Sequence, residues 1–395
     1  MTTVIGEDVV RDAHRRGQRK VVVDPRDIVT PQALDTVDRL GMQLLRAPVT
    51  PAPPLSTEPG RALSRTLYRR HPGFVPAVRR SSVRAVQLPT VAILGAGGMG
   101  GALANLIAST GAAANVVLID LLPGLAESVA VDLQHAGPLT GSATRGGGST
   151  DFASLAGADV VVVAPDVAGS PQPSALTPLL GETHMAAEAI ATYAPNAIVV
   201  FGGWPSEALT TELQRTGNFA PERILGTGAT LASARLVNAL ATAANTSPSE
   251  VEAVAIGAHG NYICPSSTAR VRGRPLQEVL RRAETDAALA AAADAPAYVQ
   301  SLRPSKPPAI ASAYAAHDVL NALRGARPGP IAVSVMVENC YNIDKVVVGV
   351  TARLTVNGLQ SVVELPLAPD ELAALQAAAD GVRRQTEEMS TLLAE

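Results

Sequence analysis

The sequence predicts an α/β protein: a parallel-sheet domain followed by an α+β domain, with an N-terminal extension in front of both. Between residues 88 and 228, short β-branched runs alternate with helical stretches, which is typical of a parallel sheet covered by helices on both faces. After residue 228, long Ala-rich helical stretches mix with strands. A proline-rich stretch separates the first residues from this body. The predicted parts are 1–47, 48–87, 88–228 and 229–395.

Residues 1–47 have the pattern of a small αβ segment. Residues 7–16 predict a short helix that ends at Gly17, and residues 20–23 predict a strand. Thr30 and Pro31 are typical of the N-cap and first residue of a second helix, which Gly41 ends. Residues 42–45 are compatible with a second strand.

Residues 48–87 are expected to form a linker and a basic helix. Five prolines fall among residues 47–60, a density that favours an extended, semi-rigid linker. Seven arginines follow within residues 61–84. Leu63 and Leu67 give this stretch a small apolar stripe that either docks onto a partner or belongs to a cationic connector. Nucleic-acid binding is the least favoured alternative, because no recognised module is present and aromatic residues are few.

Composition indicates a folded cytoplasmic protein. Of the 395 residues, 47% are hydrophobic and 17% are charged, so the chain can bury a large core. The only two cysteines favour a reducing compartment. No apolar run is long enough for a membrane span, and the N-terminus lacks the apolar core of a secretory signal. No metal site is expected.

The charge is uneven along the chain. Residues 1–90 contain 15 Lys and Arg against 8 Asp and Glu, although the whole chain has a net charge of −3. Such a contrast indicates either a separate functional unit or a solvated basic tail.

The body has a predicted order of strands and helices. Strands are expected at 91–94, 116–119, 160–163 and 198–201, with a helix at 98–110. In the last part, helices are expected at 231–245, 276–297 and 309–324, and strands at 331–337, 346–355 and 360–366.

A dinucleotide-binding motif follows the first strand of the body. Residues 95–100, GAGGMG, match G-x-G-x-x-G between a hydrophobic strand and a helix, and Asp120 ends the next strand. In this context the motif predicts a Rossmann fold that binds NAD, with the pyrophosphate at the helix N-terminus. The Asp120 carboxylate would bind the ribose hydroxyls and repel a 2′-phosphate, which favours NAD over NADP. The expected cofactor-binding residues are Gly95, Gly97, Gly98, Met99, Gly100 and Asp120.

From Val91 onward the chain resembles the lactate/malate dehydrogenase family. The resemblance lies in VAILGAGGMGGALANLIAST and VVLIDLLPGLAESVAVDLQHA in the first half, and in RILGTGATLASAR, VAIGAHGN and VSVMVENCYNIDKVVVGV in the second. It implies reversible reduction of a 2-oxo acid by NADH, and a homo-oligomer. It also implies that His259 is the acid/base residue and that Arg235 binds the substrate carboxylate.

The resemblance also shows departures at the substrate site. Ala232 stands where the family has an aspartate that orients the histidine, and Trp204 replaces the asparagine of an Asn-Pro pair beside the nicotinamide and substrate. The loop after Ala164 lacks the family's arginines, and no Lys or Arg occurs from residue 146 to 214. Asp166 and His184 are open alternatives for the missing carboxylate's role.

The N-terminal segment has a second resemblance. Its residues EDVVRDAHRRGQRKVVVDPRDIVTPQALDTVDRLGMQLL are similar to an N-terminal element of some bacterial microcompartment proteins. This resemblance implies that residues 1–87 tether the body to a microcompartment shell or cargo.

Two functions therefore stay open. Retention of His259 and Arg235 favours an NAD-dependent oxidoreductase that acts on a small 2-hydroxy or 2-oxo acid or a related carbonyl compound. Loss of the aspartate and the loop arginines favours a non-catalytic NAD-binding or scaffold protein.

Overall fold

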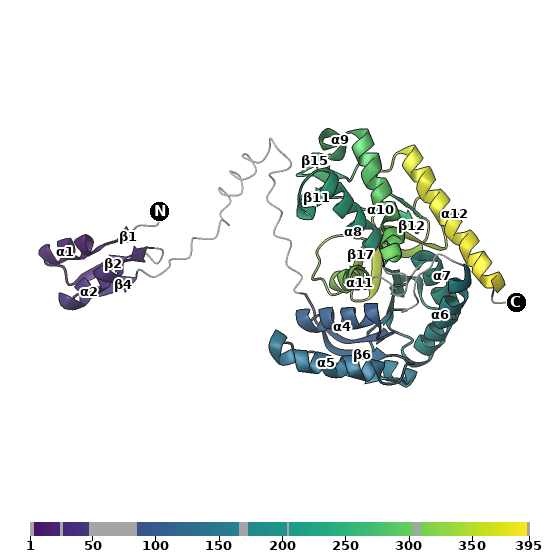
Figure 1. Ribbon diagram of the computed structural model, residues 1–395, viewed down its shortest axis with the longest axis horizontal. Helices are drawn as coiled ribbons and strands as arrows, with labels where there is room; N and C mark the ends of the chain where they lie inside the picture. The colour runs from purple at the N-terminus through teal and green to yellow at the C-terminus, as the bar shows by residue number, and fades with distance from the viewer. Residues whose placement is uncertain are drawn as a thin grey trace. The chain divides into compact units, whose positions relative to one another are not determined.

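The computed structural model describes residues 4–23, 27–46, 85–165, 173–203, 205–302 and 309–392. Residues 48–84 of the linker and basic helix expected at 48–87, together with Asp166 and Trp204, lie outside these residues. The chain divides into two compact units, Met1–Val78 and Arg79–Glu395. Each unit is considered by itself (Figure 1).

The N-terminal unit consists of two βαβ repeats. The first contains β1 (Val4–Ile5), α1 (Glu7–Arg15) and β2 (Lys20–Val23), and the second contains β3 (Ile28–Val29), α2 (Pro31–Arg39) and β4 (Gln43–Arg46). Equivalent strands pair in parallel, β1 with β3 and β2 with β4. The predicted helices and strands are confirmed, including the Thr30 cap, whose hydroxyl accepts a hydrogen bond from the Ala33 amide at 3.2 Å.

This unit buries a small core and leaves part of one sheet exposed. Its core is formed by Ile5, Val10, Val21, Val23, Ala33, Val37 and Met42. Val22 and Leu45 are register partners on β2 and β4, and they remain 65% and 42% exposed. The β2–β4 sheet thus presents an adjacent apolar pair on its outer face.

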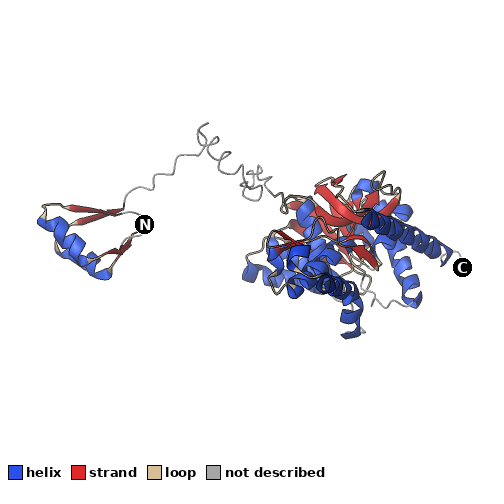
Figure 2. Ribbon diagram, turned by 90° about the horizontal axis from the view of Figure 1, so that it is seen from above, coloured by secondary structure: helices blue, strands red, loops and turns tan. Residues whose placement is uncertain are grey.

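The large unit is organised around one eleven-stranded sheet, which lies among the helices in Figure 2. Its strand order is β13-β12-β17-β16-β10-β9-β8-β5-β6-β7, and β18 pairs with β17. Neighbouring strands are parallel along the part of the sheet with the order β10-β9-β8-β5-β6-β7. On the other side of β10, β16 pairs with it in antiparallel orientation. The strands of this sheet are β5 (Leu88–Leu94), β6 (Ala113–Ile119), β7 (Arg145–Ser149), β8 (Val160–Val163), β9 (Ile198–Phe201), β10 (Ile224–Gly226), β12 (Ile256–Ala258), β13 (Asn261–Ile263), β16 (Ile331–Val337), β17 (Val346–Thr355) and β18 (Gly358–Val362).

Helices pack against this sheet and against one another. The α4 and α11 helices are in contact, and α6, α7 and the C-terminal α12 form a second group. A small sheet of β11 (Val251–Glu252), β14 (Arg270–Val271) and β15 (Arg274–Pro275) lies apart from the main one. The helices are α4 (Gly98–Thr110), α5 (Leu125–Thr140), α6 (Pro173–Tyr193), α7 (Ser206–Gly217), α8 (Gly228–Ala243), α9 (Leu276–Val279), α10 (Arg282–Leu302), α11 (Ile310–Leu323) and α12 (Pro369–Leu392).

The structure differs from the sequence expectation in the last third of the chain. The single helix expected at 276–297 is two helices, because Leu280 adopts an extended conformation with φ −114° and ψ 140°. The carboxylate of Glu284 then accepts the Arg281 amide at 2.9 Å where the second helix begins. The last expected strand lies earlier, at Gly358–Val362.

Three strands in the middle of the large sheet are entirely buried. Every residue is buried in β8 (VVVV), in β9 (IVVF) and in β16 (IAVSVMV). Such double-sided burial is what uninterrupted apolar strands require. Among the described residues, no helix is both long and apolar enough to cross a membrane.

Candidate active site

The glycine-rich loop joins β5 to α4, and its glycines are required by close backbone packing. Gly95 has φ +97°, and a β-carbon there would collide with the carbonyl oxygen of Ala164. A β-carbon at Gly100 would collide with the Gly95 carbonyl oxygen. Gly97 is the N-cap of α4, so Gly98 and Met99 form its first turn. The free N–H groups at this end of α4 suit a pyrophosphate.

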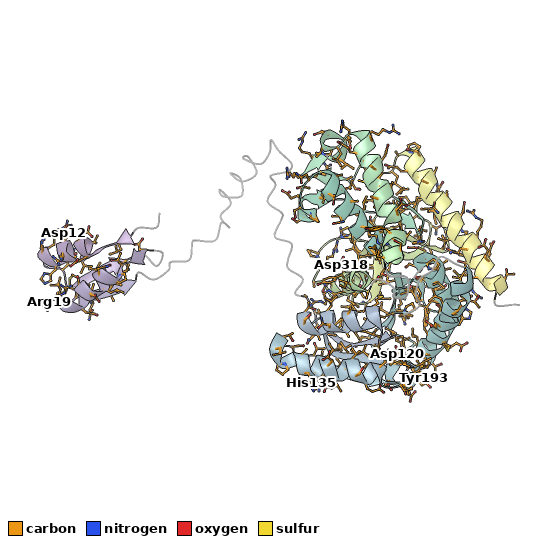
Figure 3. The ribbon with its side chains drawn as sticks, in the orientation of Figure 1. Asp12, Arg19, Asp120, His135, Tyr193 and Asp318 are labelled. Carbon is orange, nitrogen blue, oxygen red and sulfur yellow. The ribbon has the colours of Figure 1, made fainter. Side chains whose placement is uncertain are left out.

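Asp120 follows β6 and faces the same loop. Its carboxylate accepts hydrogen bonds from the amides of Ala96, at 2.7 Å, and Leu122, at 2.9 Å. It lines a cleft of about 240 Å³ together with Gly95 and Phe152 (Asp120 is labelled in Figure 3). The glycine loop and an acidic side chain thus meet at one cleft, which fits a dinucleotide with its ribose at Asp120.

Cofactor choice gives a first testable prediction. NADH is expected to bind at least about tenfold more tightly than NADPH, because a 2′-phosphate would lie against the Asp120 carboxylate. Asp120→Ser should reduce this ratio severalfold. Calorimetric titration with both dinucleotides measures it, and equal affinities for the wild-type protein would contradict the assignment.

His259 lies in the turn between β12 and β13. This turn depends on glycine, since Gly257 and Gly260 have φ values of +123° and +80°. The imidazole is half-buried. Burial, and then the nearby charge of Arg235, lower the pKa of His259 from 6.5 to about 4. The ring is therefore neutral at physiological pH and can accept a proton.

Arg235 projects from α8 toward the same place. Burial lowers its pKa, whereas Tyr262 raises it by electrostatic interaction. Its charge also acts on His259. Within the part of the chain that the structure describes, Arg235 makes no hydrogen bond or ion pair. A half-buried guanidinium without an anionic partner is suited to bind a carboxylate.

The position expected to orient the histidine is apolar. Ala232 is buried, and it packs with Leu236 and other apolar residues. His184 does not take over this role, because its imidazole lies 2.6 Å from Glu212, which also pairs with Arg215 on α7. The structure thus brings together His259 and Arg235, and places His184 in another cluster.

Three further polar residues lie at the site and were not singled out from the sequence. The carboxylate of Glu207 accepts hydrogen bonds from the Tyr262 hydroxyl at 2.6 Å, the Ser334 hydroxyl at 2.6 Å and the His259 amide at 3.1 Å. Glu207 is only 1% exposed. The position of Tyr262, three residues after His259, was the available clue in the sequence.

These features together are typical of nucleotide-dependent dehydrogenases: a Rossmann sheet with a glycine loop, an acidic residue placed for the ribose, and a histidine near an arginine. Residues 90–226 match the model of the lactate/malate dehydrogenase NAD-binding domain, and residues 229–392 match the model of the alpha/beta C-terminal domain of the same family. The chain therefore belongs to the lactate/malate dehydrogenase family, and its cofactor is NAD.

Curated relatives and solved structures agree with this assignment. Malate dehydrogenase 1 of Anaeromyxobacter dehalogenans is 30% identical over 309 residues, which are 76% of this chain and 98% of the relative. The malate dehydrogenase of Chlorobium phaeobacteroides is 27% identical over 77% of this chain and 99% of its own length. A lactate dehydrogenase structure from Cryptosporidium parvum, complexed with lactic acid and NAD, has a TM-score of 0.73 at 24% identity, covering 77% of this chain and 99% of that one. This likeness shows the fold.

Proposed function

We propose that this protein is an NAD-dependent dehydrogenase for a small 2-hydroxy or 2-oxo acid or a related carbonyl compound. One observation carries the proposal: Arg235 is a half-buried cation with no anionic partner in the described structure, within electrostatic reach of His259. The guanidinium binds the substrate carboxylate in a bidentate fashion. His259 exchanges a proton with the oxygen on the neighbouring carbon. Bound NAD supplies the hydride acceptor or donor.

The charge of the site favours acids with one carboxylate. The sequence contains no Lys or Arg from residue 146 to 214, where the family resemblance implies arginines on a loop. Arg235 is then left as the proposed anion anchor. A second carboxylate would have to be desolvated without a cation to pair with it, which is costly.

A substrate screen tests this proposal. NADH formation from NAD⁺ is followed with 2-hydroxy monocarboxylates and 2-hydroxy dicarboxylates at equal concentration. We expect turnover of at least one monocarboxylate, with a lower kcat/KM for dicarboxylates. A clear preference for dicarboxylates would contradict the single-anchor site.

The pH dependence of turnover follows from the lowered pKa of His259, which is about 4 in the folded protein. Oxidation of the hydroxy acid needs the neutral ring, which predominates above that pKa. Its kcat/KM should be nearly constant between about pH 6 and 8 and fall only in more acidic solution. Reduction of the oxo acid needs the protonated ring, so its kcat/KM should rise as the pH falls from 8 toward 5. An oxidation rate that halves near pH 6.5 would contradict this environment.

A non-catalytic NAD-binding or scaffold role is the second candidate. Apolar Ala232 at the position of the orienting carboxylate favours this role. In the analogous His–Asp pair of hydrolases, loss of the carboxylate lowers the rate by up to about 10⁴-fold. Titration with NADH while exciting Trp204, the only tryptophan, separates the candidates when combined with the substrate screen. Saturable NADH binding without turnover of any acid or aldehyde would favour the scaffold role.

We further propose that residues 1–87 attach the dehydrogenase to a bacterial microcompartment. The separate N-terminal unit and its exposed Val22–Leu45 pair support this proposal, together with the sequence resemblance. A fluorescent protein carrying residues 1–87 should co-localise with shells, and Val22→Asp should abolish this. Diffuse fluorescence of the unaltered fusion would contradict it. A homo-oligomer is also expected, and sedimentation of the full chain tests that expectation.

A further inference from the structure

The buried carboxylate of Glu207 connects the two halves of the candidate site. Glu207 lies in the first turn of α7 and binds the His259 amide, which belongs to the β12–β13 turn. It also binds the Ser334 hydroxyl on β16. Ser334 in turn accepts the Ala229 amide at 3.2 Å, at the start of the helix that carries Arg235. One side chain thus joins the elements that carry the proposed acid/base residue and the proposed anion anchor.

Tyr262 is the third member of this cluster and extends it toward Arg235. Its hydroxyl lies 2.6 Å from Glu207, and its charge state is coupled electrostatically to both Glu207 and Arg235. The ring packs with the apolar cluster that contains Ala232. A β-carbon at Gly228 would collide with the Tyr262 hydroxyl and with the Glu207 carboxyl group. The glycine at the start of α8 therefore makes room for this pair of side chains.

Three hydrogen bonds hold the Glu207 side chain in one orientation. The His259 amide is necessarily a donor, and the Ser334 hydroxyl donates to Glu207 while it accepts from Ala229. Burial raises the pKa of Glu207, but these hydrogen bonds oppose that rise. The pKa of Tyr262 is raised well above 10 by burial and by Glu207, so the phenol keeps its proton and donates it to the carboxylate. The cluster thus ties one buried acidic side chain to the His259 turn, to β16 and to Tyr262.

We propose that Glu207 and Tyr262 are positioning residues that fix the His259 turn and the start of the helix that carries Arg235, in a site where position 232 supplies no carboxylate. The inference rests on the proposed function, because it concerns the same His259 and Arg235. Glu207 holds the turn through the His259 amide, while Tyr262 extends the cluster toward the Arg235 guanidinium. When substrate binds, its carboxylate becomes the direct partner of Arg235, and the Glu207–Tyr262 hydrogen bond keeps both groups in place.

Two substitutions separate these roles. Tyr262→Phe keeps the ring and removes one hydroxyl, so KM for the acid should rise about tenfold while kcat changes less than threefold. Glu207→Gln replaces one acceptor oxygen by an NH₂ group that opposes a donor, either the His259 amide or the two hydroxyls. Its kcat/KM should fall about 100-fold or more, because kcat should be lower and KM higher than in the wild type. The affinity for NADH should stay within about twofold in both variants.

A matched control exists in the same helix. The side chain of Glu212 is also fully buried, but its partners are His184 and Arg215 rather than the site. Glu212→Gln should lower the melting temperature and leave kcat/KM within about twofold of the wild type. Equal losses of kcat/KM in the two glutamate variants would overturn the proposal, since the effect would then reflect general instability.

The remaining outcomes are also decisive. If the wild type turns over an acid but Tyr262→Phe and Glu207→Gln retain wild-type kcat and KM, the positioning proposal fails and the proposed function stands. If the wild type turns over no acid, both fail. Should Glu207→Gln not fold, the KM and kcat of Tyr262→Phe alone decide, because that variant keeps the packing of the ring.

Discussion

Substitution of His259 by asparagine should lower kcat/KM for the hydroxy acid by about 10²- to 10⁴-fold, which is the range for a general acid–base residue. His259 lies within electrostatic reach of Arg235, and its lowered pKa keeps the imidazole neutral at physiological pH. Asparagine keeps a polar side chain of similar length but cannot accept a proton. Steady-state kinetics with saturating NAD⁺ measure the loss.

The His259 substitution has a matched control elsewhere in the chain. His184→Asn changes a histidine whose partner is Glu212, in a different cluster. It should leave kcat/KM within about threefold of the wild type. An undiminished rate in His259→Asn would refute the assignment of His259 as the acid/base residue.

Substitution of Arg235 by lysine should raise KM for the acid by about 10- to 100-fold, because hydrogen bonds to charged groups contribute about 1.5–3 kcal/mol. Lysine keeps the positive charge but cannot form a bidentate pair with a carboxylate. The half-buried position of Arg235 makes this geometry more important than it would be at the surface. Initial rates over a range of acid concentrations give KM and kcat separately.

Arg274→Lys provides the control for charge-preserving substitution, since Arg274 is exposed and pairs with the nearby Glu278. Its KM should match that of the wild type. If Arg235→Lys also left KM unchanged, the substrate carboxylate would have to bind elsewhere.

The sequence predicted the cofactor half of the molecule well because its requirements are local. The glycine motif, the strand before it and Asp120 all lie within about one βαβ unit. The structure shows why two of the glycines are needed: β-carbons at Gly95 and Gly100 would collide with backbone oxygens. Buried strands such as β8 and β9 were likewise evident from continuous β-branched residues.

The substrate half was less predictable because its contacts join distant residues. Glu207 and Ser334 are 127 positions apart, yet their side chains form a 2.6 Å hydrogen bond. Ser334 lies within the segment VSVMVENCYNIDKVVVGV that carries the family resemblance, but nothing in that segment indicates that its hydroxyl meets Glu207 beside His259. The boundary expected at residue 228 divides strands of one sheet, because β16 from the second part pairs antiparallel with β10 from the first. Antiparallel pairing across that boundary cannot be inferred from the residues of β16 alone.

The most direct test of the account is to follow the hydrogen on the hydroxyl-bearing carbon. The protein is incubated with NAD⁺ and a 2-hydroxy monocarboxylate that carries deuterium at C2, and the nicotinamide product is analysed by mass spectrometry. We expect NADH that contains one deuterium, and loss of this product in His259→Asn. Saturable NADH binding without any deuterated NADH, across the whole panel of acids, would contradict the dehydrogenase function and leave the scaffold role.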